Sequence, residues 1–317
     1  MIARARTLPL GLDLGASRIR IALARAEADG SARVTAVASR DVAGDPALLP
    51  ALLEEMVAEL GTRERRCVTS VGVPRATLRI MKLPKMTWAE RVRTARFEAE
   101  QFAEWDVHGA PTGVRIHEFD RSQGLYAIGA TRTGELEALG RLLRSSGLRS
   151  VAVDHDAFAL RRVLPLCDAI VDVGLERSTL HVYEAASVRS IHIPLGGACV
   201  TRGIAQDLSI DALSAERRKR ILGSAGAGND ARDELVRAIA TAVERSRARS
   251  PITRLALTGN GARLPGIGPS LETSTGAIVE IPVAQSAPYD AYPHDVIRSA
   301  APDWALAIAL STWGCAS

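Results

Sequence analysis

Short apolar runs alternate along this chain with polar turns and with longer stretches of helical periodicity. The first part of the sequence predicts strands over residues 9–13, 19–24 and 33–38, a helix over 46–60 and another strand over 67–73. Strands interleaved with a helix in this way indicate an α/β domain.

A second group of elements follows. Prolines bound an extended stretch over 73–84, and Thr87 is predicted to cap a helix over 88–102, with Glu90 completing a capping box. The next elements are strands over 114–119 and 125–130, a helix over 134–146 and a strand over 148–153. Near the other end, residues 304–310 are apolar on every side, which predicts a buried closing helix that begins near Pro302 and Asp303.

Length and composition indicate a protein with more than one core. The chain has 317 residues, of which 47% are hydrophobic and 4% aromatic, and chains of more than about 250 residues usually divide their core. The net charge is +4, yet all but three of the 40 basic residues are arginines. We interpret this as a compositional bias and expect no nucleic-acid partner, because the basic runs lack interleaved aromatic residues.

The remaining composition favours a cytoplasmic protein. Its four cysteines show neither a C-x-x-C pair nor a metal-binding spacing, so we expect reduced thiols. The first ten residues lack the apolar region of a signal peptide, and no apolar run has the length of a membrane span. We therefore expect no direct membrane span.

Three predicted strands end in glycine-containing turns that suit a nucleotide. Asp13 and Gly15 form one Asp-x-Gly motif, Asp172 and Gly174 form a second, and a glycine cluster over 259–262 follows a third strand. Glycine lets backbone amides approach phosphate oxygens, and carboxylates hold Mg²⁺ through its water ligands. The alternative interpretation is that all three are ordinary strand-ending turns in an unrelated α/β protein.

The order of these turns resembles the actin, sugar kinase and Hsp70 ATPase superfamily, over nearly the whole chain. Glu216 and Lys219, on one face of a predicted helix, resemble the helix that contacts adenosine in that superfamily. The resemblance implies a two-lobed actin-like (ribonuclease H-like) α/β fold that binds ATP and Mg²⁺, with Asp13 and Asp172 beside the metal. The implied nucleotide-contacting residues are Gly11, Asp13, Gly15, Ala16, Ser17, Arg20, Asp172, Gly174, Gly196, Gly197, Glu216, Lys219, Gly259, Asn260 and Gly261.

Hydrolysis of ATP is a separate question. By its spacing before Asp172, Asp156 occupies the position where relatives orient the attacking water, and Arg20 occupies one where relatives place a cation toward the phosphates. Asp156 is equally suited to cap the N-terminus of a helix, a role that Asp154 could also fill. We expect at most a slow ATPase.

Several phrases resemble the PilM family of type IV pilus assembly proteins. They are Pro84–Met86, Phe97–Phe102, Val153–Leu160, Ile193–Gly197, Thr201–Ala205 and Leu264–Ile267. The resemblance implies a scaffold, peripheral to the inner membrane, that binds the cytoplasmic tail of a PilN-like bitopic membrane protein beside other pilus components. Candidate contacts for that tail are Val73, Pro74, Thr77, Arg79 and Ile80.

The expected division follows from the same comparison. Residues 1–72 and 151–167 form the first lobe, 73–150 an inserted α+β unit, and 168–317 the second lobe, with 197–251 as its small outer part. Two other kinds of function stay open. One is a scaffold of a related secretion system or an FtsA-like division protein, and the other is a small-molecule kinase of the sugar kinase type.

Overall fold

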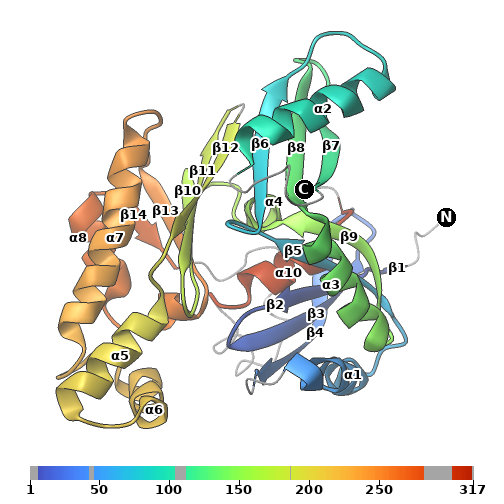
Figure 1. Cartoon of the computed structure of the whole chain (residues 1–317). Coiled ribbons are helices and arrows are strands. Elements are labelled where there is room, and N and C mark those ends of the chain that lie inside the picture. Colours follow the sequence, from blue (N-terminus) through green and yellow to red (C-terminus); the bar gives the residue numbers. More distant parts are fainter. Residues whose placement is uncertain (1–5, 43–45, 104–111, 186, 282–301, 316–317) are drawn as a thin grey trace.

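The chain forms two lobes with a smaller unit protruding from one of them (Figure 1). The computed structural model describes residues 6–42, 46–103, 112–185, 187–281 and 302–315. Among these residues, no helix is long and apolar enough to cross a membrane.

The first lobe is built on a mixed sheet with the order β4–β3–β2–β5–β9. Its strands are β2 (Leu10–Leu14), β3 (Arg18–Ala26), β4 (Ala32–Asp41), β5 (Arg66–Val71) and β9 (Arg149–His155), and the short β1 (Arg6–Thr7) pairs with the end of β3. The first three strands are antiparallel, while β2, β5 and β9 are parallel. Its helices are α1 (Leu49–Glu59), which follows a 3₁₀ turn at Pro46–Leu48, α3 (Thr133–Ser145) and α4 (Asp156–Val163).

The second lobe repeats this sheet order as β12–β11–β10–β13–β14. The strands are β10 (Ala169–Val173), β11 (Ser178–Glu184), β12 (Ser187–Ile193), β13 (Arg254–Thr258) and β14 (Ile278–Glu280). As in the first lobe, β12, β11 and β10 are antiparallel to their neighbours, while β10, β13 and β14 are parallel. The helices are α5 (Gly197–Leu208), α6 (Ala212–Leu222), α7 (Asn229–Arg247) and α8 (Ile267–Thr275), with a 3₁₀ turn at Asn260–Arg263.

The protruding unit is a three-stranded sheet covered on one face by a helix. Its strands are β6 (Ala76–Lys82), β8 (Leu125–Arg132) and β7 (Thr112–Asp120), in that order, and the helix is α2 (Trp88–Phe102). The predicted capping box is confirmed, because Thr87 Oγ1 accepts from the Glu90 amide and the Glu90 carboxylate accepts from the Thr87 amide. The unit contacts both lobes, since β6 lies against β12 and Phe119 stacks on Phe158 of α4.

Helix α3 packs on the first lobe as well as on β7 and β8 of the inserted unit, the unit in which the sequence-based division over 73–150 placed it. Leu143 and the following Leu148 are buried in the same core as Met56 of α1. Arg149 already belongs to β9, which pairs with β5. The amphipathic pattern of α3 shows that it has a buried face, but a single sequence does not say which sheet covers that face.

The closing helix α10 (Ala305–Ser311) joins the two lobes. It packs on β2, β3 and β5 of the first sheet and on α4, and its apolar residues share one core with Ile170 and Ala256 of the second sheet. Gly11 allows this contact, because a Cβ at that position would strike the backbone at Ala307 and Ser311. The predicted buried closing helix is therefore confirmed, and Gly11 has a packing role.

We expect Gly11→Ala to destabilise the protein by about 1–3 kcal/mol, because the added methyl overpacks the contact between β2 and α10. Gly129→Ala in β8 is the matched control, since its Cβ would meet nothing within 4 Å. Urea unfolding followed by circular dichroism measures both variants. Equal stability of the two would contradict this role for Gly11.

Candidate functional site

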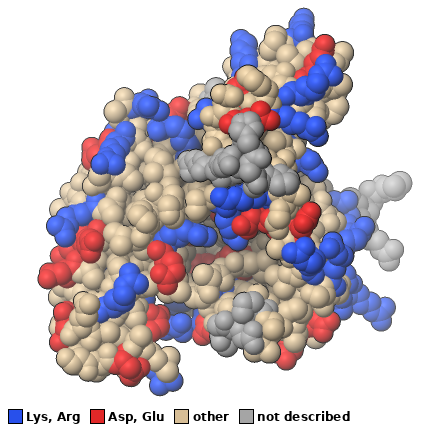
Figure 2. Space-filling view, in the orientation of Figure 1, with Lys and Arg blue, Asp and Glu red and all other residues tan. Residues whose placement is uncertain are grey.

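A cavity of about 370 Å³ lies between the lobes and is visible as a hollow in Figure 2. Ser17 and Arg18 of the first lobe line it opposite residues of the second lobe. Seven of the predicted nucleotide residues line this cavity, namely Ser17, Gly174, Gly197, Glu216, Lys219, Asn260 and Gly261. Ala16 lines an adjoining hollow that also holds Ser17 and Glu216.

Two equivalent hairpin turns face each other at this junction. Asp13 lies on β2 opposite Arg20 of β3, and Asp172 lies on β10 opposite Thr179 of β11. The glycine that ends each motif lets the turn close tightly, because a Cβ on Gly15 or Gly174 would lie within 3 Å of a backbone carbonyl oxygen across the turn. The repeated sheet order therefore brings the two Asp-x-Gly motifs together.

The carboxylates at this junction repel one another. Burial raises the pKa of Asp172 to about 7, and repulsion by Asp13 and Asp156 contributes to that rise. Burial also raises the pKa of Asp13 to about 6, although the neighbouring Arg20 opposes this. The four acids Asp13, Asp156, Asp172 and Asp303 outnumber the one buried arginine, Arg20, and a hydrated divalent cation would offset the excess of negative charge.

Asp156 is not the cap of helix α4. The N-cap is His155, whose Nδ1 accepts from the Ala157 amide at 3.2 Å. Asp154 forms an ion pair with Arg162 at 2.7 Å, so it does not cap the helix through its side chain either. Asp156 instead lies close to Gly72, where a Cβ would collide with its carboxylate. Both capping alternatives are therefore wrong, and the Asp156 carboxylate is available at the junction.

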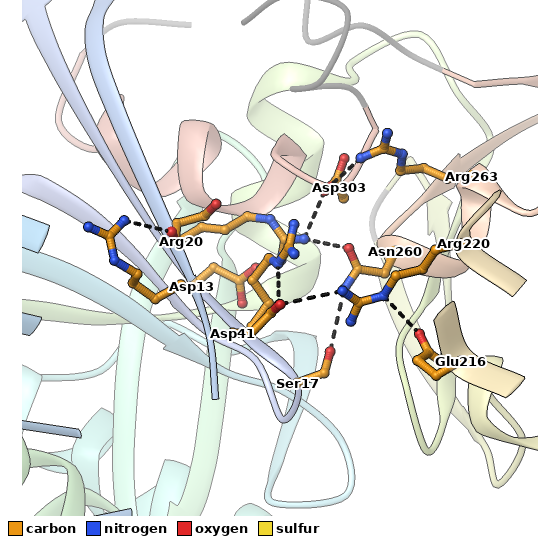
Figure 3. Close-up of polar contacts among 12 residues, drawn as sticks. Asp13, Ser17, Arg20, Asp41, Glu216, Arg220, Asn260, Arg263 and Asp303 are labelled. Atoms are coloured by element: carbon orange, nitrogen blue, oxygen red, sulfur yellow. Dashed lines mark hydrogen bonds and ion pairs between the residues drawn. The ribbon is translucent and has the colours of Figure 1, made fainter. Parts of the chain in front are cut away.

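Arg20 is held beneath the site and does not line the cavity (Figure 3). Its guanidinium is 4% exposed and donates to Asp303 at 2.8 Å and to Asn260 at 2.5 Å, and it pairs with Asp13 at 3.4 Å. The expectation that Arg20 extends toward the phosphates is not supported by this geometry. The residue acts as the counterion of buried carboxylates from both ends of the chain.

Glu216 and Lys219 form a closed polar cluster on α6. Lys219 Nζ lies 2.7 Å from Glu216 Oε2, and it donates to Thr201 Oγ1 at 2.7 Å and to the Gly197 carbonyl at 2.9 Å. Burial alone would raise the pKa of Glu216, but hydrogen bonds from Lys219 and Thr201 hold it below its ordinary value. The cluster presents an ionised carboxylate and an ammonium group at one wall of the cavity.

Three glycines of the second lobe allow close backbone packing around the second Asp-x-Gly turn. Gly259 has φ +83°, and a Cβ there would lie 2.6 Å from Asp172 Oδ1, so a side chain is excluded. Gly261 lies against Val173, and Gly196 lies against the backbone of Leu175. These positions require glycine for close backbone packing around the second Asp-x-Gly turn.

Four further polar residues border the site and were not predicted from the sequence. Arg18 and Arg220, which line the cavity, both pair with Asp41, at 2.8 Å and 3.4 Å, and thereby join the lobes. Figure 3 shows Arg220 and Asp41. Arg263 lies on the opposite side and pairs with Asp303 at 3.8 Å. Arg18 directly follows Ser17, which was a usable signal, but the other contacts join residues far apart in the sequence.

The five candidate partner contacts do not form one surface. Val73 is buried and Pro74 is exposed in the turn before β6. Thr77 and Arg79 pair with the α2-facing residues of β8, and Arg79 lies over the Phe102 ring at 4.9 Å. Ile80 therefore faces away from α2, because side chains alternate along a strand.

The comparisons with known proteins agree with this architecture. The sequence matches no protein-family model and no curated protein. Among solved structures, the chain is similar to the PilM–PilN type IV pilus biogenesis complex, with 23% identity, a TM-score of 0.82, and coverage of 98% of this chain and 99% of that chain. It is also similar to the ethanolamine utilization protein EutJ from Carboxydothermus hydrogenoformans, with 15% identity, a TM-score of 0.63, and coverage of 98% and 90%.

A third similar structure is MreB 5 of Spiroplasma citri bound to AMPPNP, with 12% identity, a TM-score of 0.50, and coverage of 90% and 93%. The chain has the actin-like ATPase fold. The predicted fold class is therefore confirmed, and the resemblance to PilM is confirmed at the level of the fold.

The raised carboxylate pKa values predict how stability depends on pH. Between the ordinary pKa of 3.8 and the folded value of about 7, the folded protein binds a proton at Asp172 that the unfolded chain has lost, so this group lowers stability as pH rises. We expect Asp172→Asn to raise the melting temperature at pH 8 by about 2–5 °C, and by less at pH 5, in Mg²⁺-free buffer.

Asp168→Asn is the control with the opposite sign. Burial favours a higher pKa at Asp168, yet hydrogen bonds from Thr253 and from the Arg254 amide lower it, so its loss should destabilise the protein at pH 8. Thermal unfolding of both variants at both pH values tests the argument. A lower melting temperature for Asp172→Asn at pH 8 would contradict it.

Proposed function

We propose that this protein is an ATP-binding scaffold of the type IV pilus assembly kind. The observation that carries the proposal is the pair of Asp-x-Gly hairpins, which repeat the same sheet position in two lobes and meet at one cavity. The similar structure that contains PilM and PilN extends over nearly the whole of both chains. The fold alone would also be compatible with a small-molecule kinase. The function therefore has to be argued from the site and from the inserted unit.

The residues at the cavity fit a magnesium nucleotide. The hairpin turns offer backbone amides and the Ser17 hydroxyl to phosphate oxygens, while Glu216 and Lys219 line the wall expected to contact adenosine. Asp13 and Asp172 carry the unbalanced negative charge that a water-coordinated Mg²⁺ would offset. Bound Mg²⁺ would supply charge neutralisation at the phosphates.

Hydrolysis, if it occurs, depends on Asp156. Its carboxylate interacts electrostatically with Asp13 and Asp172 and is not used as a helix cap, so it can accept a hydrogen bond from water. A single oriented water without a further acid or base supports only slow turnover. Fast phosphate release stimulated by a sugar would instead favour the kinase alternative.

We expect Asp13→Asn to weaken Mg²⁺-dependent ATP binding by about 10- to 100-fold, because the residue would no longer hold the metal waters. Asp156→Asn removes one carboxylate from the same cluster and is the matched control. It should bind ATP as the wild type does while it slows any hydrolysis. Isothermal titration calorimetry with and without Mg²⁺ measures binding, and an absence of ATP binding by the wild type would overturn the nucleotide assignment.

The partner would be the cytoplasmic tail of a PilN-like membrane protein, which would place this chain at the cytoplasmic face of the inner membrane. Strand β9 ends the first sheet, and among the described residues no strand pairs with its outer edge. Val151 and Val153 on this edge strand are 37% and 39% exposed. An exposed strand edge with apolar side chains suits an extended peptide, which would add a further strand by main-chain hydrogen bonds.

The inserted unit adjoins this edge. Helix α4, which follows β9 directly, holds Phe158 against Phe119 of β7 with ring centroids 6.0 Å apart. Ile80 and Phe119 lie on strands of the same unit, and Ile80 faces away from α2. Of the candidate contacts named above, Ile80 is the one that is partly exposed on the face of β6 turned away from α2.

We expect Val153→Asp to weaken binding of the tail peptide by about tenfold or more, because a charge replaces an apolar contact at the pairing edge. Ile278→Asp is the matched control, since Ile278 is an exposed aliphatic residue on β14, the edge strand of the second sheet. Fluorescence anisotropy with a labelled tail peptide measures both. Equal weakening by the two variants would remove β9 from the binding site.

A further inference from the structure

The inserted unit ends in an exposed basic tip that no part of the proposed nucleotide or partner site uses. We define the tip as residues 82–88, which join β6 to α2, and residues 121–124, which join β7 to β8. A hydrogen bond from the Leu83 amide to the Gly124 carbonyl, at 3.0 Å, holds the two turns side by side. The tip is the end of the molecule farthest from the first sheet in Figure 1.

Cations at the tip are free of partners. Lys82, Lys85 and Arg121 are exposed, and none of them forms an ion pair with another residue that the structure describes. Two of the three lysines in the whole chain lie here. Figure 2 shows blue side chains gathered on this protruding unit.

The flanking acids are directed toward the protein's own backbone. Glu90 accepts from the Thr87 amide at 2.7 Å, and Asp120 accepts from the Ser122 and Gln123 amides at 2.9 Å and 3.2 Å. The Ser122 hydroxyl, which donates to Asp120 at 2.6 Å, and these backbone hydrogen bonds lower the pKa of both carboxylates and fix them at the turns. Glu118, farther along β7, is the nearest exposed acid on that strand. Both carboxylates stay ionised, but Lys82, Lys85 and Arg121, with the exposed Arg93 at the start of α2, still outnumber them at the turns.

The tip also carries an exposed aromatic ring. Trp88, at the first position of α2, is 56% exposed, and Pro84 in the preceding turn is exposed as well. An indole ring next to lysines matches the interface of a bilayer, where the ring lies at the level of the headgroups and the lysines contact phosphates. A nucleic-acid strand would need a groove that follows several phosphates, whereas this surface protrudes.

We propose that the tip of the inserted unit binds the surface of an anionic phospholipid bilayer, with Lys82, Lys85 and Arg121 at the headgroup phosphates and Trp88 in the interface. Each cation near such a surface contributes about fivefold to partitioning, so the three together give on the order of 100-fold preference for anionic over neutral vesicles. Binding of this strength supplements a membrane-anchored partner and does not replace it.

The test is co-sedimentation of the full chain with vesicles of phosphatidylcholine alone or with roughly one third phosphatidylglycerol. We expect binding to the anionic vesicles only, reversed by about 0.5 M salt through screening. The variant Lys82→Ala with Lys85→Ala should bind about 25-fold more weakly. Lys82→Arg with Lys85→Arg should bind as the wild type does, and Trp88→Ala should weaken binding while its salt dependence persists.

The control for net charge is Arg245→Ala with Arg249→Ala, which removes two exposed cations from the second lobe. It should retain binding if the location of the charge matters. Equal losses in the two double alanine variants, or equal binding to neutral and anionic vesicles, would overturn the proposal. So would an absence of vesicle binding by a wild type that still captures an acidic protein through Lys82 and Lys85. The vesicles contain no protein or nucleotide, so the outcome is independent of the proposed scaffold function.

Discussion

The close contact between α10 and β2 determines how the two lobes are joined. Gly11 lets the backbone of α10 lie directly against β2, the central strand of the first sheet. At the start of that helix, the buried pair of Arg20 and Asp303 joins segments 283 residues apart in the sequence. A buried charge that loses its partner is strongly destabilising, so this pair fixes one arrangement of the lobes. The geometry of the cavity between the lobes therefore depends on the packing around α10.

Because the two lobes share one sheet order, like charges meet at the junction between them and repel one another. Because Asp13 and Asp172 occupy equivalent strand positions, the two lobes bring their carboxylates together with Asp156, and burial and repulsion raise the pKa of both motif residues. A protein selected only for stability would replace one of them. Strongly perturbed carboxylates that lie close together are typical of a functional site, which is why their charge supports the proposed nucleotide site.

The sequence predicts those features that depend on neighbouring residues. Alternating apolar positions and turn glycines locate most strands, and Thr87 with Glu90 predicts the start of α2, because these signals act over a few residues. Contacts between distant segments are not encoded in any local pattern. Three features depend on which surfaces meet in the folded protein. They are the ion pair of Arg20 with Asp303, the packing role of Gly11 and the packing of α3 on the first lobe. His155 caps α4 although the acids on either side of it are the more usual caps.

The inserted unit contacts both lobes, so its position depends on the angle between them. Phe119 stacks on Phe158 of the first lobe, while β6 lies against β12 of the second. Packed interfaces of this kind do not deform continuously, so a change in the angle between the lobes must shift or break one of these contacts. A ligand that favours one lobe angle would thus be energetically linked to any ligand that contacts the inserted unit. Such linkage needs no residue shared between the two sites, and it acts with equal strength in both directions.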